Sequence, residues 1–259
     1  MHLSSLTKTQ SSLLLITLFL FFGCGQQESE PKLVIATAAN MQFAMEDLVS
    51  AFTKETGIKC EIVISSSGKL TAQIQAGAPF DVFVSADLKY PESLHQAGLT
   101  SGPPAVYAHG QLVLWSTSNT GPPHLDQLTD GAVAHIAMAN PKTAPYGHAA
   151  AQVLAANQLT GPLEKKLVYG ESIAQTNQFI ISGAAEVGFT ALAVVQSPIL
   201  KDSGHWTLIP PEQYHPIEQG VVVLQQDDAS KADAQAFADF LLSAQAKEIL
   251  DTFGYLTDL

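Results

Sequence analysis

The spacing of apolar positions changes repeatedly along this chain and predicts alternating strands and helices. Residues 33–36 form a short apolar run and residues 59–64 alternate apolar with polar positions, which are both strand patterns. Between these strands apolar residues recur every three or four positions from Met41 to Phe52, and this spacing predicts a helix. We expect Asn40 to cap its start and Gly57 to end it. Further strands are predicted at residues 81–84, 112–115, 134–139, 167–169, 188–190 and 216–224.

The order of these elements predicts an α/β fold with two lobes, each a mainly parallel sheet flanked by helices. Composition changes at Ser101-Gly102-Pro103-Pro104, where we expect the chain to cross into a second lobe. The run 216–224 is predicted to cross back. Residues 32–108 and 222–259 then form lobe 1, residues 109–221 form lobe 2, and the two crossover segments act as hinges. Such clamps bind ligands where strand ends and helix starts face each other.

The first residues predict export. Lys8 precedes an apolar run at residues 13–22, which is too short for a membrane span but typical of a signal peptide. This predicts a signal peptide at residues 1–23. The following Gly23-Cys24-Gly25 resembles a bacterial lipoprotein signal, which implies lipid on Cys24, a tether at residues 24–31 and a lipid-anchored location in the periplasm or on the cell surface. An ordinary cleaved signal is the alternative, and both readings place the protein outside the cytoplasm.

The charge balance restricts the class of partner. The whole chain has 12 Lys and Arg against 24 Asp and Glu. Residues 1–23 contain one Lys and no acid, so the remainder has 11 basic and 24 acidic residues, a net charge of −13. Nucleic acid and anionic lipid surfaces are therefore unfavourable partners. A small anion is also repelled at long range, so any anion site must act through local donors.

A serine-rich stretch stands where a strand leads into a helix. Ser65, Ser66, Ser67 and Gly68 follow the strand 59–64, and helical spacing begins at Leu70. The first N–H groups of a helix lack internal partners and carry partial positive charge, so this stretch predicts an anion site made from neutral donors. The alternative is that Ser67 only caps the helix. Small or polar residues precede three more predicted helix starts, at Asn40, Tyr146 and Ile173.

Catalytic motifs do not support an enzyme. The sequence has no G-x-S-x-G, H-E-x-x-H or P-loop pattern. A secreted serine hydrolase with Ser67 as nucleophile stays open, but it needs a histidine and an acid beside that serine. His148 is the one histidine near a candidate site, and a solvent-facing role is the simpler interpretation. A protein that binds a cation through Asp and His side chains is a further alternative.

Five stretches together resemble the molybdate-binding proteins of ABC transporters. The stretches are Ala38-Ala39-Asn40, Ser65-Ser66-Ser67-Gly68-Lys69-Leu70, Gln75-Ala76-Gly77-Ala78-Pro79-Phe80-Asp81-Val82-Phe83-Val84-Ser85-Ala86-Asp87, Ala139-Asn140-Pro141-Lys142-Thr143-Ala144-Pro145-Tyr146-Gly147 and Phe253-Gly254-Tyr255. The similarity covers nearly the whole chain after the signal. It implies a type II periplasmic-binding-protein clamp that captures molybdate or tungstate, delivers it to an ABC permease and catalyses nothing. A binding protein for sulfate or another small oxyanion is the alternative.

The resemblance also implies which residues bind the oxyanion. Asn40 would offer its main-chain N–H and side-chain NH₂, Ser67 its hydroxyl and N–H, and Tyr146 and Ile173 their main-chain N–H groups. Molybdenum would thus be held as molybdate, with no direct cation ligand and no cofactor, by a monomer. Some family members have a ligand-contacting tyrosine where this chain has Ala191. We hypothesise that the hydroxyl of Tyr146 replaces it. Selectivity against the smaller sulfate would come from cavity size.

Overall fold

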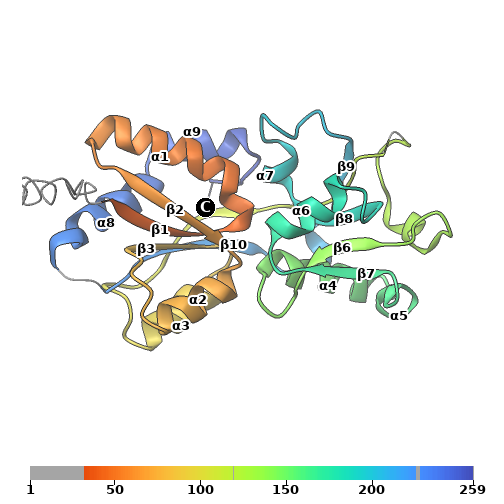
Figure 1. Cartoon of the computed structure of the whole chain (residues 1–259), viewed down its shortest axis with the longest axis horizontal. Helices are drawn as coiled ribbons and strands as arrows, with labels where there is room; N and C mark the ends of the chain where they lie inside the picture. Colours follow the sequence, from red (N-terminus) through yellow and green to blue (C-terminus); the bar gives the residue numbers. More distant parts are fainter. Residues whose placement is uncertain (1–31, 119, 226–227, 259) are drawn as a thin grey trace, which may run out of the picture. The chain divides into compact units, whose positions relative to one another are not determined.

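Two five-stranded sheets with helices packed against them make up the part of the chain that the structure describes (Figure 1). The structure is a computed structural model, and it describes residues 32–118, 120–225 and 228–258. The predicted signal peptide (residues 1–23), the predicted lipidation site Cys24 and the predicted tether (residues 24–31) lie outside the described residues. No helix within the described ranges is both long and apolar enough to cross a membrane.

The first sheet has the strand order β2-β1-β3-β10-β4. Its strands are β1 (Leu33–Ala38), β2 (Cys60–Ser65), β3 (Val82–Ser85), β4 (Ala105–Gly110) and β10 (Ile217–Val223). The helices that follow its strands or close the chain are η1 (Ala39–Met41), α1 (Gln42–Thr56), α2 (Ser67–Gln75), α3 (Lys89–Gln96), α8 (Asp228–Leu241) and α9 (Ala244–Thr252). Strand β1 pairs in parallel with β2 and β3, whereas β10 runs antiparallel to β3 and β4.

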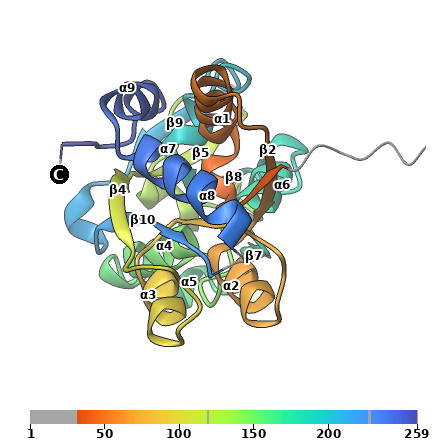
Figure 2. The ribbon, with the colours of Figure 1, turned by 90° about the vertical axis from the view of Figure 1, so that its left-hand side faces the viewer.

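Helices cover both faces of this sheet, which explains why the inner strands β1 and β3 read as nearly continuous apolar runs. Figures 1 and 2 show α1 and α9 on one face and α2 and α3 on the other. Neighbouring residues of β1 point to opposite faces, so Ile35 packs with the α1 core and Ala36 with the α2 core. On the α1 side, the rings of Phe52 and Phe237 meet edge to face with centroids 5.2 Å apart.

The second sheet has the order β7-β6-β8-β5-β9. Its strands are β5 (Leu112–Ser116), β6 (Ile136–Ala139), β7 (Leu167–Gly170), β8 (Val187–Ala191) and β9 (His205–Leu208). The helices between these strands, and the turn after β9, are η2 (Leu125–Thr129), α4 (Pro145–Ala156), α5 (Thr160–Leu163), α6 (Ile173–Ile181), α7 (Leu192–Val195) and η3 (Pro211–Gln213). Strand β6 pairs in parallel with β7 and β8, while β5 runs antiparallel to β8 and β9.

The α/β clamp architecture predicted from the sequence is confirmed, but both sheets are mixed rather than mainly parallel. The antiparallel pairings involve the strands next to the crossovers, β4, β5, β9 and β10. Right-handed βαβ connections fix strand direction only within one sheet, so a strand that arrives from the other sheet is free to run in the opposite sense. The boundary predicted at residues 221 and 222 falls inside β10, while residues Lys32–Leu259 form one compact unit.

Candidate functional site

The four predicted binding residues line one small cavity. Asn40 comes from η1, Ser67 from α2, Tyr146 from α4 and Ile173 from α6, so both sheets contribute elements. The cavity is small, with a volume of about 10 Å³. Its complete lining is Ala38, Ala39, Asn40, Ser66, Ser67, Ala86, Ala144, Pro145, Tyr146 and Ile173.

The serine stretch supplies hydroxyl groups without capping its helix. Ser66 occupies the N-cap position in an extended conformation, but its side chain makes no capping bond, and its buried hydroxyl has no partner among the described residues. Ser67 is the first helical residue, so the interpretation of Ser67 as the cap is wrong. Its Oγ accepts the N–H of Ala86 at 3.0 Å, which leaves the hydroxyl proton available for another acceptor. Its own N–H lacks an intrahelical partner because it begins the helix.

Asn40 takes a different role from the one expected for its side chain. It lies within η1, whose N-cap is Ala38, so the predicted capping role of Asn40 is wrong. Its Nδ2 donates to Gln219 Oε1 at 2.8 Å and to the hydroxyl of Tyr255 at 2.9 Å. The two amide protons are thus already used, and the main-chain N–H is the donor that Asn40 retains for an anion in this structure.

Tyr146 and Ile173 bring two more helix starts to the cavity. Tyr146 follows Pro145, which begins α4 and has no N–H of its own to satisfy. Ile173 begins α6 after Ser172, whose Oγ accepts the N–H of Gln175 at 3.4 Å. Both residues stand in the first turn of a helix, where main-chain N–H groups have no intrahelical acceptor.

The hydroxyl of Tyr146 is buried and has no hydrogen bond within the described residues. It lies against Gly110, because a Cβ added there would be 2.1 Å from this hydroxyl and 2.7 Å from Gln219 Nε2. Burial is the main cause that raises its pKa well above the usual tyrosine value, with a further contribution from the neighbouring Tyr255. The nearby Asn40 amide weakly opposes this shift. The hydroxyl therefore stays protonated and can act only as a neutral group.

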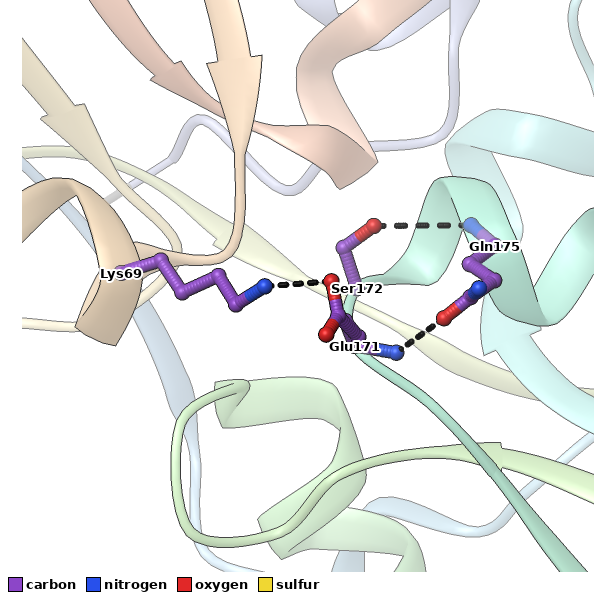
Figure 3. A network of polar contacts seen from close by, with 4 residues as sticks. All are labelled: Lys69, Glu171, Ser172 and Gln175. Atoms are coloured by element: carbon purple, nitrogen blue, oxygen red, sulfur yellow. Dashed lines mark hydrogen bonds and ion pairs between the residues drawn. The ribbon is translucent and has the colours of Figure 1, made fainter.

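Charged side chains are absent from the cavity lining but meet beside it. Lys69, two residues after Ser67, pairs with Glu171, two residues before Ile173 (Figure 3). The main-chain N–H of Glu171 also donates to Gln175 Oε1 at 2.7 Å. The charge of Lys69 is thus balanced by Glu171, and this partly exposed pair contributes at most about 1 kcal/mol. An anion in the cavity must therefore be held by neutral donors.

Two further hydrogen bonds join the elements of the first sheet to the loop before α4. The N–H of Gly68 donates to the carbonyl of Thr143 at 2.9 Å, and the hydroxyl of Tyr90 donates to the carbonyl of Lys142 at 3.2 Å. A Cβ at Gly68 would lie 2.8 Å from the Tyr90 hydroxyl and 2.9 Å from the Thr143 carbonyl oxygen. Only glycine permits this close approach next to the cavity.

The hydrolase and cation-binding alternatives gain no support from the geometry. No histidine, Asp or Glu lines the cavity, and the partner of Ser67 Oγ is a main-chain N–H. His148 lines a separate cleft together with Asp87 and His215. Within the described ranges, no group of three or more His, Cys, Asp or Glu residues could hold a metal ion.

Ala191 is fully buried at the end of β8 and lies opposite Leu112 of β5. It is the position at which some family members have a ligand-contacting tyrosine. It does not line the cavity. Sequence reasoning missed the two partners of the Asn40 amide, Gln219 and Tyr255. The Phe253-Gly254-Tyr255 stretch was noted as part of the resemblance, but nothing local in the sequence signals that Gln219 lies near the cavity.

Comparison with known proteins gives one consistent result. The family model described as bacterial extracellular solute-binding protein matches residues 33–256. The chain is 42% identical over 237 residues to a molybdate-binding protein ModA of Azotobacter vinelandii, covering 90% of this chain and 92% of the relative. It is 36% identical over 242 residues to ModA of Rhodobacter capsulatus, covering 93% and 94% of the two chains.

A solved structure agrees with these relatives. The periplasmic molybdate-binding protein of Azotobacter vinelandii superposes with a TM-score of 0.82 at 36% identity, covering 88% of this chain and 100% of that one. This chain belongs to the family of bacterial extracellular solute-binding proteins, and it is a binding protein rather than an enzyme.

Proposed function

We propose that this chain captures molybdate or tungstate outside the cytoplasm and delivers it to the permease of an ABC transporter. The observation that carries the proposal is the cavity itself, where four helix starts and the hydroxyls of Ser66 and Ser67 meet without any charged side chain. The named relatives from Azotobacter and Rhodobacter are molybdate-binding proteins, which supports the choice of ligand.

Neutral donors suit this ligand because molybdate is a fully deprotonated oxyanion whose every oxygen accepts hydrogen bonds. The proposed donors are the main-chain N–H groups of Asn40, Ser67, Tyr146 and Ile173, joined by the hydroxyls of Ser67 and Tyr146. Each hydrogen bond to an ionised group contributes roughly 1.5–3 kcal/mol, so roughly five to seven of them offset the cost of removing the anion from water. No cofactor is needed for this chemistry.

The finer points of location and assembly are also proposals. Gly23-Cys24-Gly25 supports lipid attachment at Cys24, which would hold the protein at a membrane surface while residues 24–31 act as a tether. A single lipid anchor and a two-lobed clamp fit a monomer that meets its permease with both lobes. The high acidic content supports neither nucleic acid nor an anionic membrane surface as a partner.

Calorimetry on residues 26–259 with four separate anions tests the proposed function. We expect one-to-one binding of molybdate and tungstate, with sulfate weaker by roughly 100-fold or more, because a rigid set of donors cannot all reach a smaller anion and about 3 kcal/mol is lost. Phosphate should also bind weakly, since its proton requires an acceptor that these donors do not offer. Equal binding of sulfate would change the proposed substrate, and no heat from any anion would contradict the proposal.

Replacing Tyr146 by phenylalanine tests the hypothesis that its hydroxyl substitutes for a tyrosine at position 191. We expect molybdate affinity to fall by roughly 10-fold or more, because a buried, unpaired donor gains a charged acceptor only when the anion is bound. The ligand-free thermal unfolding midpoint should stay unchanged or rise, since the variant removes an unsatisfied polar group. Unchanged molybdate affinity would assign the contribution of Tyr146 to its main-chain N–H alone.

A further inference from the structure

The side chain of Gln219 is fully buried and makes hydrogen bonds with both ends of its amide. Nε2 donates to the carbonyl of Ala86 at 3.2 Å and to that of Ile217 at 3.3 Å. Oε1 accepts from Asn40 Nδ2 at 2.8 Å and from the hydroxyl of Tyr107 at 3.4 Å. Because carbonyl oxygens can only accept, they fix the orientation of the amide and leave Oε1 to face Asn40.

Two of these partners, Asn40 and Ala86, line the cavity, although Gln219 itself does not. Ala86 in turn contacts Ser67: its N–H donates to Ser67 Oγ at 3.0 Å, while its carbonyl accepts from Gln219. One side chain thus connects the anion-binding groups at the start of η1 with those at the start of α2.

The backbone around Gln219 directs its side chain toward these groups. Gln219 lies on β10, which returns from the second sheet to pair with β3 and β4. The register between β10 and β4 shifts at Gln219 and Gly220, an irregularity of the kind that re-aims a side chain. Gly110 at the end of β4 leaves the space that Gln219 Nε2 and the Tyr146 hydroxyl occupy.

We propose that Gln219 is a positioning residue that fixes the distance between the donors of Asn40 and Ser67 and thereby sets the discrimination between molybdate and smaller oxyanions. The inference rests on the proposed function. A site selects anions by size only if its donors keep their spacing when a smaller anion enters. A group that fixes the distance between two donors therefore contributes to selectivity as well as to affinity. A residue that only stabilised the fold would not change the ratio of two affinities.

The test uses Gln219→Met, which keeps the length of the side chain and removes its hydrogen bonds, and Gln219→Glu, which keeps an acceptor for Asn40 but loses the donor to Ala86. Molybdate and sulfate are titrated into each variant by calorimetry, and the unfolding midpoint is recorded without ligand. Thr190→Val is the matched control, because it removes a buried side-chain hydrogen bond of 2.6 Å to Asn177 that involves no residue of the cavity lining.

We expect both Gln219 variants to lose roughly 10-fold or more in molybdate affinity and to lower the molybdate-to-sulfate affinity ratio at least several-fold. The control should lower the unfolding midpoint and keep the ratio within about two-fold. A wild-type ratio in a folded Gln219 variant would overturn the inference. If Gln219→Met does not fold, the molybdate-to-sulfate affinity ratio of Gln219→Glu tests the inference in its place. Failure of the wild-type protein to bind molybdate would contradict the proposed function instead.

Discussion

Replacing Ser67 by alanine is expected to weaken molybdate binding by roughly 10- to 150-fold, which corresponds to the loss of one hydrogen bond to an ionised group of about 1.5–3 kcal/mol. The substitution removes a cavity hydroxyl whose oxygen already accepts from Ala86 and whose proton is therefore available for the anion. It also leaves that buried N–H without its acceptor, which adds to the loss. Calorimetry or competition with a weaker oxyanion measures the change.

Ser65→Ala is the matched control for this experiment. Ser65 ends β2 two residues earlier, carries the same hydroxyl and does not line the cavity. Its substitution should leave molybdate affinity within about two-fold of the wild type. Wild-type affinity in Ser67→Ala would remove the serine hydroxyl from the binding site and leave the main-chain N–H groups as the donors.

Replacing Gly68 by alanine is expected to weaken molybdate binding by roughly 10- to 100-fold while leaving the ligand-free protein folded. The new Cβ would meet the Tyr90 hydroxyl at 2.8 Å and the Thr143 carbonyl at 2.9 Å, and overpacking of this kind costs about 1–3 kcal/mol. Thr143 belongs to the loop before α4, so the added methyl group opposes closure of a hinged clamp more than folding. A titration and a thermal melt without ligand separate the two effects.

Gly102→Ala controls for the general effect of a glycine replacement, because a Cβ there meets no atom within 4 Å. We expect both variants to have similar ligand-free unfolding midpoints, and Gly68→Ala alone to have a weakened affinity. A large drop in the midpoint of Gly68→Ala with normal affinity would show that this contact stabilises the fold rather than the closed, ligand-bound arrangement.

Neutral donors reconcile an anion site with a strongly acidic protein. The chain carries a net charge of −12, so long-range attraction cannot draw an oxyanion to it. Lys69 stands beside the cavity, but its charge is balanced by Glu171 (Figure 3). The proposed site must therefore hold the anion through local dipoles and hydroxyls.

Several features of the fold and site depend on residues close together in the chain and were predictable on that account. Period changes in the apolar pattern predict most strands and the helices that begin near Asn40, Ser67, Tyr146 and Ile173, because side-chain direction repeats within a single element. The transitions from strand to helix at Ser67 and Ile173 are local in the same sense. The sequence places the N-cap of α2 at Ser67, one residue after the observed cap Ser66. The two residues have the same side chain, and only their backbone conformation distinguishes them.

Other features depend on residues far apart and were decided by tertiary structure. The reversed directions of β5 and β10 follow from two crossings between sheets, which no local pattern encodes. The amide of Asn40 is bonded to residues 179 and 215 positions away, so its side chain turns from the cavity toward Gln219 and Tyr255. Buried polar groups must find partners wherever packing places them, and those partners appear only when the chain is folded.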